Sequence, residues 1–365
     1  MNTERKTINQ MEPWIGEEEK KAMAEYLESG GWLTEFQKTR EFEGMIASYV
    51  GSAYASVVPN GTVSLLVALL AIGLERLDEV IVPDYTMIAS ANAVILAGGT
   101  PVLVDIDSRH LCLDLEGTRR AIGPKTKAIM LVTINGRYPD MEKFRELAKE
   151  RNLLLLEDAA QSLGSRCQGK HLGTFGDIGS FSFSSPKIIT TGQGGALVTD
   201  DEKLYQKILN IKDFGRTKGG VDEHQTLGYN FKFTDLQAVI GIEQMKKLPW
   251  RVERKKEMFK LYQDFLKDVK AVTFVETNLQ DTAPWFIDVL VEQREKLSEF
   301  LKEKGVGTRP FYPAIHTQSP YAWVQGRFPV SEEVSRKGLW LPSSSFLTDE
   351  DIASVCQAIR EFFQR

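Results

Sequence analysis

One lysine in this 365-residue chain lies in a setting that suits amine chemistry. Lys187 closes the segment GSFSFSSPK (179–187), so it follows a strand-like run and several hydroxyl groups. A lysine held among apolar and hydroxyl groups can have a lowered pKa and act as a nucleophile. A surface lysine in a turn would explain the same segment. The glycines of TTGQGG (190–195) do not form a dinucleotide-binding fingerprint, because they follow no βα turn of the required form.

A carboxylate and an amide follow a second apolar run. In LLLLEDAAQ (153–161), Asp158 comes just after the run and Gln161 three residues later. A buried carboxylate is costly unless it meets a cation or a hydrogen-bond donor, and a protonated pyridine nitrogen would be such a partner. A nearby Lys or Arg, or a helix capped by Asp158, fits the segment equally well. Glu157, the alternate neighbour, is expected to face the other way.

A third segment is suited to holding a phosphate group. Asn60, Gly61 and Thr62 precede the apolar run VSLLVALLAIG (63–73), which is typical of a helix. A glycine and a hydroxyl residue at a helix start leave backbone N–H groups free at the positive end of the helix dipole. A simple helix cap, in which Thr62 satisfies its own helix, is the alternative explanation.

The elements around these segments predict an α/β fold. Strands alternate with helices between residues 54 and 200, which indicates βαβ units and a mostly parallel sheet between helices. We expect a loose N-terminal arm (1–12), a large domain (13–248) and a smaller α+β domain (249–365), with the boundary where Pro249 separates two helices (234–246 and 251–268). The expected strands are 79–82, 101–104, 127–132, 153–156, 178–183 and 195–198, followed by 271–275 and 284–291 in the smaller domain.

The composition excludes several classes of protein. A net charge of −5 and a pI of about 5.6 argue against nucleic acid or an anionic membrane as a partner. The chain has no signal-peptide pattern and no apolar run long enough to span a bilayer, so we expect a cytoplasmic protein. Cysteines and histidines are scattered without the spacing of a disulfide framework or a metal site; they are Cys112, Cys167, Cys356, His110, His171, His224 and His316.

In this order, the segments resemble the fold-type I aminotransferases that depend on pyridoxal phosphate, and within them the DegT-type sugar aminotransferases. The resemblance covers nearly the whole chain and implies a large domain with a seven-stranded-type sheet. Each segment is weak alone, but the ordered set is specific. The matching segments are GWLT (31–34), NGT (60–62), EDAAQ (157–161), SFSFSSPK (180–187), TTGQGG (190–195), GYN (228–230) and RPFYPAIH (309–316).

This resemblance implies a role for each matching residue. Lys187 would bind the cofactor covalently, Asp158 would pair with its pyridine nitrogen, and Gln161 would lie beside its ring hydroxyl. Asn230 would reach the cofactor phosphate of a neighbouring subunit, which implies a homodimer. The phosphate itself would be held by Gly61, Thr62 and Ser182, and the substrate would be contacted by Trp32, Arg309, Tyr312 and His316.

Two positions depart from the family pattern. An aromatic residue commonly stacks on the cofactor ring in the segment PDYTM (83–87), but the matching position here is Met87. Sulfur can contact a ring face, so cofactor binding does not depend on the aromatic residue. The family also has an arginine where this chain has Lys232, which would change contacts near the phosphate or the sugar nucleotide.

The run PKIITTGQGG (186–195) is most similar to that of the perosamine synthases, which aminate the 4-keto group of a GDP-linked 6-deoxy sugar. The resemblance therefore implies transfer of an amino group, with L-glutamate as the expected donor, to a nucleotide-linked 4-keto-6-deoxy hexose in amino-sugar and polysaccharide biosynthesis, such as that of an O-antigen. Glutamine as donor, a dTDP- or UDP-linked sugar, a 3-keto sugar and a cyclitol ketone stay open. A related branch has histidine in place of the lysine and removes a sugar hydroxyl, and Lys187 argues against that branch.

Other kinds of protein are weaker explanations. A cysteine desulfurase needs an activated cysteine on a mobile loop, and none of the three cysteines has such a setting. A nucleotide-binding α/β protein would need a Walker-type phosphate loop or a dinucleotide fingerprint, and neither is present. A non-catalytic regulatory protein could keep the fold, but it would have no reason to keep Lys187, Asp158 and Gln161 together.

Overall fold

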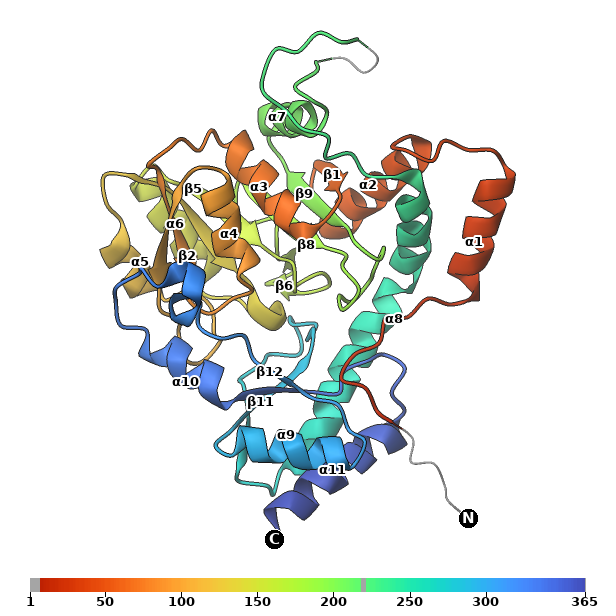
Figure 1. Cartoon of the computed structure of the whole chain (residues 1–365), viewed down its shortest axis with the longest axis vertical. Coiled ribbons are helices and arrows are strands. Elements are labelled where there is room, and N and C mark those ends of the chain that lie inside the picture. Colours follow the sequence, from red (N-terminus) through yellow and green to blue (C-terminus); the bar gives the residue numbers. More distant parts are fainter. Residues whose placement is uncertain (1–6, 218–220, 365) are drawn as a thin grey trace.

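The computed structural model describes residues 7–217 and 221–364. A seven-stranded sheet with helices on both faces forms the larger part, and a four-stranded sheet with its own helices forms the smaller part (Figure 1). The predicted α/β class is therefore confirmed. The helices of the larger part are α1 (Glu17–Glu28), α2 (Gln37–Val50), α3 (Gly61–Ala71), α4 (Ala89–Leu96), α5 (Leu115–Ala121), α6 (Met141–Glu150) and α7 (Glu202–Lys212).

The large sheet has the strand order β1-β9-β8-β5-β4-β2-β3. Only β9 runs antiparallel to its neighbours in this sheet, and the other pairs between adjacent strands are parallel. Consequently β1, β5 and β8 end at the same edge of the sheet. The strands are β1 (Tyr54–Val58), β2 (Glu79–Pro83), β3 (Thr100–Val104), β4 (Thr126–Val132), β5 (Leu154–Asp158), β8 (Ile178–Ser182) and β9 (Gly195–Thr199), with a separate hairpin of β6 (Arg166–Cys167) and β7 (Lys170–His171).

Both faces of this sheet are buried, which explains why its strands are apolar throughout. Successive residues of β4 point to opposite faces, so Met130 packs with the cluster around α3 and α4 while Leu131 packs with the cluster around α6. On the α6 side, helix residues Phe144 and Leu147 are fully covered. The helices thus form two outer layers around a central sheet (Figure 1).

Polar residues cap several of the helices. Asn60 caps α3 by accepting a hydrogen bond from the Val63 N–H at 2.9 Å, as a residue at that position should. Asp201 caps α7 in the same way, although that helix was not among the predicted ones. Gly51 ends α2 with φ of 77°, a left-handed conformation that glycine adopts at low cost.

The predicted helix break at Pro249 is wrong. The structure has one continuous helix, α8 (Asp235–Leu266), with Pro249 inside it. A proline removes one backbone hydrogen bond and usually kinks a helix. Here buried neighbours on both sides hold the chain in place: Leu248 is fully buried, and Arg251 donates hydrogen bonds to the Ile188 carbonyl (2.8 Å) and to Gln244 (2.8 Å). The domain limits 13–248 and 249–365 stay a prediction.

The smaller part packs around its own apolar cluster, which includes Met258 and Phe259 from the second half of α8. Its sheet has the order β10-β11-β13-β12 with antiparallel pairs. The elements are β10 (Val272–Phe274), β11 (Ile287–Val291), α9 (Arg294–Glu303), β12 (Arg309–Pro310), α10 (Pro329–Lys337), β13 (Gly338–Leu341) and α11 (Asp349–Phe363), with single 3₁₀ turns at Ile134–Gly136, Ile315–Thr317 and Ser319–Tyr321.

The described part of the N-terminal arm is fixed to this smaller part. Ile8 exchanges backbone hydrogen bonds with Gly305 and Gly307 at 2.9 and 2.7 Å, and Ser343 donates to the Gln10 carbonyl at 2.7 Å. Residues 7–12 are therefore not loose, contrary to the prediction. Residues 1–6 of the predicted arm lie outside the described residues.

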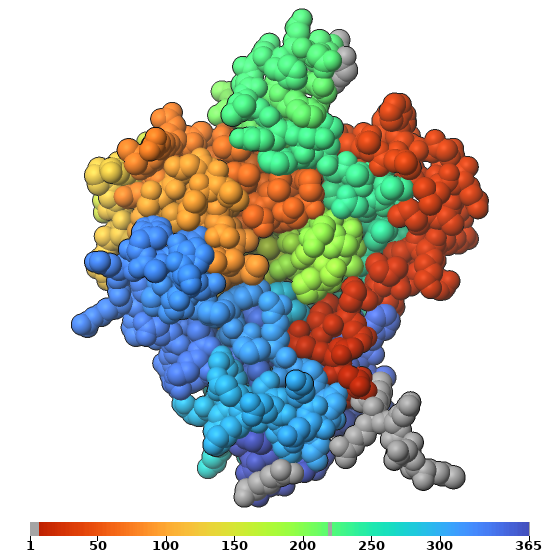
Figure 2. Space-filling model, viewed as in Figure 1, coloured from red at the N-terminus to blue at the C-terminus, as the bar shows by residue number. Residues whose placement is uncertain are grey.

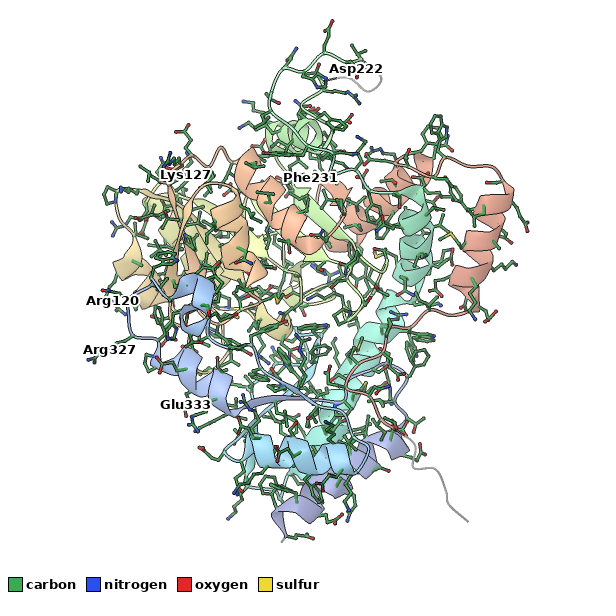
Figure 3. All side chains as sticks on the ribbon, in the orientation of Figure 1. Arg120, Lys127, Asp222, Phe231, Arg327 and Glu333 are labelled. Atoms are coloured by element: carbon green, nitrogen blue, oxygen red, sulfur yellow. The ribbon has the colours of Figure 1, made fainter. Side chains whose placement is uncertain are left out.

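A loop after α7 projects from the larger part (Figure 2). Figure 3 shows Asp222 far out on this loop and Phe231 at its base. Ion pairs link its described residues: Arg216 pairs with Asp222 at 2.6 Å, and Lys232 pairs with Asp213 at 2.8 Å. In the described ranges, no helix is both long and apolar enough to cross a membrane.

A buried ion cluster joins three elements of the larger part. Lys212, at the end of α7, is 1% exposed; its Nζ lies 3.0 Å from Glu35 and 3.5 Å from Glu43, and it donates to the Val57 carbonyl of β1 at 2.7 Å. Arg40 also pairs with both carboxylates. Since a buried carboxylate without its partner is strongly unfavourable, Lys212 should stabilise the packing of α2, β1 and α7.

Replacing this lysine tests that role. We expect Lys212→Met to lower the free energy of unfolding by about 3 kcal/mol, because it leaves two carboxylates and a carbonyl short of a donor. Lys207→Met, on the exposed side of the same helix, should change it by no more than about 0.5 kcal/mol. Urea unfolding followed by circular dichroism measures both. Equal losses in the two variants would contradict the assignment.

Candidate active site

The carboxyl ends of β1, β5 and β8 open into a cavity of about 670 Å³. Its wall combines these strand ends with residues of the smaller part, so it lies between the two parts of the chain. Nine of the predicted site residues line it: Gly61, Thr62, Met87, Asp158, Gln161, Ser182, Lys187, Arg309 and Tyr312. The structure thus brings together segments that are far apart in the sequence.

Three predicted site residues do not line this cavity. Trp32 is 66% exposed, before α2, and its ring lies 6.0 Å from that of Phe36. Asn230 is exposed at the base of the projecting loop, where it forms a β-bridge with Asp213. His316 binds Asp84 at the end of β2, with 2.7 Å between its Nδ1 and the carboxylate.

The Lys187 amine is surrounded by protein groups, although the residue as a whole is only partly buried because the cavity opens beside it. Its Nζ lies 4.0 Å from the centre of the Trp285 ring. Burial lowers the pKa of Lys187 to about 8; the Asp158 carboxylate opposes this shift, and Arg309 adds to it. A buried amine of this kind is in part neutral near physiological pH and can act as a nucleophile or base.

The Asp158 carboxylate ends β5 and faces the same cavity. It accepts hydrogen bonds from the Ser90 hydroxyl at 2.6 Å and from the Ala160 N–H at 3.1 Å. Burial raises the pKa of Asp158, and these hydrogen bonds and the Lys187 charge oppose the rise. Glu157 points the other way, as expected, and accepts backbone N–H groups of Gly173 and Gly176, both at 2.7 Å.

Gln161 is held by a residue from the end of β4. Its Oε1 accepts the backbone N–H of Asn135 at 2.8 Å. Asn135 itself has φ of 53°, a left-handed conformation that asparagine tolerates better than most residues. Because the Gln161 oxygen is engaged, its amide nitrogen is the group left to donate to a ligand.

The start of α3 forms a close backbone cradle. The first two N–H groups of a helix have no partner inside it, and at α3 these belong to Gly61 and Thr62. A Cβ atom at Gly61 would come within 2.9 Å of the Ser182 Cβ, and one at Gly195 within 2.5 Å of the Asn60 carbonyl oxygen. Side chains at either glycine would therefore fill the space where the helix start meets β8 and β9.

The two residues that depart from the family pattern, Met87 and Lys232, lie in different parts of the structure. Met87 lines the cavity and is 44% exposed, so its side chain is free to contact a ligand. Tyr85, the aromatic residue of the same segment, is buried behind it against Phe311 at 5.9 Å. Lys232 pairs with Asp213 within the projecting loop, and its Nζ lies 4.4 Å from the Phe214 ring centre.

Several residues of the site were not predicted. Trp285, Ser184 and Gln193 line the cavity, and Ser90 and Asn135 hold residues that do. Trp285 lies just before β11, in a segment whose apolar character predicts only a strand. Ser184 and Gln193 had a signal in the sequence, because they belong to the segments SFSFSSPK (180–187) and TTGQGG (190–195).

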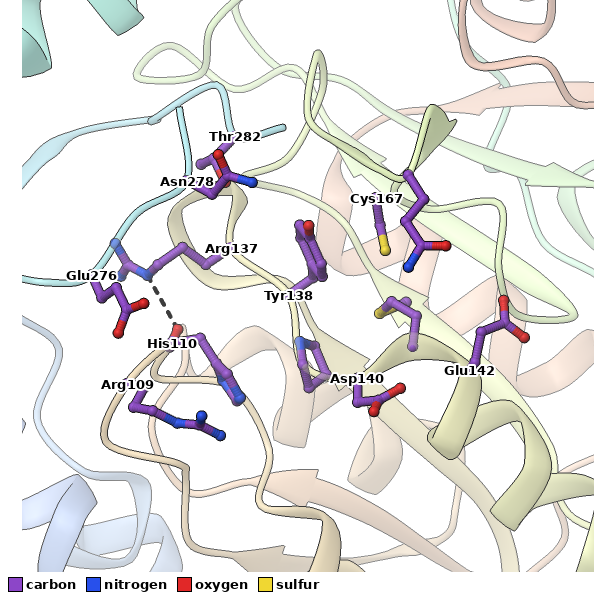
Figure 4. Close-up of a pocket in the computed structure, with 13 residues that line it drawn as sticks. Arg109, His110, Arg137, Tyr138, Asp140, Glu142, Cys167, Glu276, Asn278 and Thr282 are labelled. Atoms are coloured by element: carbon purple, nitrogen blue, oxygen red, sulfur yellow. Dashed lines mark hydrogen bonds between the residues drawn. The ribbon is translucent and has the colours of Figure 1, made fainter. Parts of the chain in front are cut away.

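A second cavity of about 430 Å³ surrounds Arg137 (Figure 4). Arg137 is buried there in an ion pair with Asp288 at 2.6 Å and donates to the His110 carbonyl at 3.1 Å. None of the predicted site residues lines this cavity. No group of three potential ligands among the described His, Cys, Asp and Glu residues could hold a metal ion.

The cysteines offer no activated thiol. All three are buried. Burial raises the pKa of Cys112 and of Cys356 to about 12 and also raises that of Cys167. Since the thiolate is the reactive form, these surroundings do not suit a cysteine nucleophile.

A family model and a relative of known name both match nearly the whole chain. A family model described as the DegT/DnrJ/EryC1/StrS aminotransferase family matches residues 13–360. The chain is 37% identical over 363 residues to a GDP-perosamine synthase of Escherichia coli O157:H7, covering 98% of this chain and 99% of that one.

Solved structures agree with this relation. The chain is similar to Helicobacter pylori PseC, an aminotransferase involved in the biosynthesis of pseudoaminic acid, with a TM-score of 0.92, 27% identity and coverage of 98% and 100% of the two chains. It is also similar to Escherichia coli GDP-4-keto-6-deoxy-D-mannose-3-dehydratase with bound hydrated PLP, with a TM-score of 0.89, 25% identity and coverage of 96% and 98%.

The lowered pKa of Lys187 gives a test on the protein without added ligands. We expect the rate of its acetylation by acetic anhydride to rise with pH and level off around a midpoint near 8, because burial leaves half of the Lys187 amines neutral there, whereas acetylation of the exposed Lys207 should keep rising above that pH. A lysine with the ordinary pKa of about 10.4 would still be mostly protonated at that pH. Mass spectrometry of peptides containing residue 187 measures the extent. A midpoint above 10 would contradict the burial argument.

Proposed function

The chain belongs to the DegT/DnrJ/EryC1/StrS aminotransferase family, whose members are sugar aminotransferases that depend on pyridoxal phosphate, and on that premise we propose how it works and on what. It transfers an amino group from L-glutamate to the keto group of a nucleotide-linked 4-keto-6-deoxy hexose. The product would be an amino sugar for polysaccharide biosynthesis.

One observation carries the proposal. An amine and a carboxylate, Lys187 and Asp158, face the same cavity, yet neither forms an ion pair within 4.0 Å among the described residues. Buried opposite charges normally pair, because separation leaves each of them short of a partner. A ring that lies between them, with an aldehyde for the amine and a protonated nitrogen for the carboxylate, would satisfy both.

The rest of the cavity fits the same group. The free N–H groups of Gly61 and Thr62 at the start of α3, together with the Ser182 hydroxyl, suit a phosphate. Hydrogen bonds from Ser90 and Ala160 orient the Asp158 carboxylate, which would then bind a cation in the cavity. The Gln161 amide is oriented by Asn135 so that it can donate to the ring hydroxyl.

In this mechanism the residues position groups and move protons. When bound, pyridoxal phosphate supplies the electron sink for the carbon that carries the amino group. Lys187 would hold the cofactor covalently through Nζ, and in its free form that Nζ would carry a proton from the donor carbon to the cofactor side. Asp158 would keep the ring nitrogen protonated. Met87, which lines the cavity, would contact the ring face.

The acceptor would lie over the side of the cavity formed by the smaller part. Arg309 and Tyr312 line that side, and we assign them to the substrate, with Trp32 and His316 as outer contacts. Asn230 would complete the phosphate site of a second copy of the chain in a homodimer, which agrees with its exposed position. The identity to a GDP-perosamine synthase and the run PKIITTGQGG (186–195) favour a GDP-linked sugar.

Replacing Lys187 tests the covalent role. We expect Lys187→Ala to lose the visible absorbance band of the cofactor-loaded protein and to lower turnover by at least about a thousandfold, because both the covalent bond and the proton carrier disappear. Absorbance spectra and a coupled assay for 2-oxoglutarate measure the two effects. Lys207→Ala is the matched control. Turnover that persists in Lys187→Ala would end the proposal.

The substrate is tested by a screen of acceptors. We expect the glutamate-treated protein to aminate a GDP-linked 4-keto-6-deoxy hexose with a kcat/KM at least about tenfold above that for the dTDP- or UDP-linked sugar, because the nucleotide is recognised apart from the reacting carbon. Mass spectrometry of the sugar product measures each reaction. A preference for another nucleotide, a 3-keto sugar or a cyclitol ketone would overturn the choice of acceptor while leaving the chemistry at Lys187 intact.

A further inference from the structure

We propose that Trp285 is a positioning residue for Lys187: its indole fixes the amine at the place from which it bonds to the cofactor. Trp285 belongs to the smaller part of the chain, whereas Lys187 follows β8 of the larger part. The proposal rests on the proposed function, because it concerns how the covalent amine of that function is held.

The first contact is with the indole face. The Lys187 Nζ lies 4.0 Å from the ring centre, which is within the range of a cation–π interaction. Among the described residues, Lys187 forms no ion pair within 4.0 Å, although the Asp158 carboxylate faces the same cavity. Trp285 as a residue is 3% exposed, and a desolvated aromatic face attracts a cation more strongly than an exposed one.

The second contact is with the backbone next to the lysine. The indole Nε1–H donates to the Pro186 carbonyl at 2.7 Å. That carbonyl belongs to the peptide bond that joins Pro186 to Lys187, so one tryptophan holds both the main chain and the side-chain end of the lysine. A lysine has four rotatable side-chain bonds, and two anchors restrict it far more than one would.

Trp285 is itself fixed by its surroundings. Buried Lys255 of α8 donates to the Trp285 carbonyl at 2.9 Å and also to the Ser343 carbonyl. Asn135 brackets the next residue, Phe286, by donating to its carbonyl at 2.9 Å and accepting its N–H at 2.7 Å. Because Asn135 also holds Gln161, one polar network sets the positions of the amide and the indole on the cavity wall.

The step that should depend on Trp285 is the covalent capture of pyridoxal phosphate by the empty protein. The Lys187 ammonium first releases one proton to solvent. Its neutral nitrogen then bonds to the aldehyde carbon, the carbon–oxygen bond breaks, and the oxygen leaves as water with the two remaining amine protons. Rates of this kind are sensitive to the approach of the reacting atoms, and a misplacement of about 1 Å can cost about a hundredfold. Binding of pyridoxamine phosphate, which has no aldehyde, needs no attack by the lysine and therefore reports the rest of the cavity.

The experiment compares four proteins freed of cofactor: the wild type, Trp285→Leu, Trp285→Phe and Phe259→Leu. Leucine removes the ring face and the N–H, whereas phenylalanine keeps a ring face. Phe259→Leu is the matched control, since Phe259 is equally buried in the smaller part but does not line the cavity. Stopped-flow absorbance gives the rate of capture of pyridoxal phosphate, and calorimetry gives the Kd for pyridoxamine phosphate.

We expect Trp285→Leu to slow capture by at least about tenfold while the Kd for pyridoxamine phosphate stays within about threefold of the wild-type value. Trp285→Phe should recover part of the rate, and Phe259→Leu should match the wild type in both measurements. An unchanged rate in Trp285→Leu, or a Kd that weakens in proportion to the rate, overturns the positioning role. If the wild type itself captures no pyridoxal phosphate, the proposed function fails instead.

Discussion

The separation of two desolvated charges dominates the centre of this protein. The amine of Lys187 and the carboxylate of Asp158 face one cavity without meeting, and each is kept in place by neutral partners: an indole face for the amine, a hydroxyl and a backbone N–H for the acid. Such an arrangement costs folding free energy, because burial disfavours the charged form of each group and neither gains an ion pair. The surrounding packing must therefore hold the amine and the carboxylate apart.

The sheet supplies that packing. Parallel strands end at a common edge, so β5 delivers Asp158 and β8 leads to Lys187 from neighbouring positions, while the start of α3 follows β1 at the same edge. Glu157, the residue before Asp158, has the opposite orientation and fixes the turn at Gly173 and Gly176 instead. Successive side chains of a strand point to opposite faces of the sheet. Glu157 therefore has a structural role, whereas its neighbour Asp158 faces the cavity.

The sequence predicts those parts of the site that depend on local order. Asp158 and Lys187 follow strand-like runs and Gly61 precedes an apolar helical run, and a mostly parallel sheet then implies that such strand ends share one edge. Trp285 and Asn135 could not be found in this way, because their roles arise only when β11 packs against the end of β4. The failed helix break at Pro249 has the same origin: local backbone preference predicts a stop, and buried tertiary contacts around Arg251 outweigh it.

Because the unbroken helix α8 belongs to both parts of the chain, we expect neither part to fold as a separate fragment. Its first half packs under the large sheet and its second half forms the core of the smaller part. A chain divided at residue 249 would leave each piece with half a helix and a bare apolar stripe, with Leu248 on one piece and Met258 on the other. Truncations and gene fusions designed around two autonomous modules would therefore yield insoluble halves rather than a cofactor-binding unit and a lid.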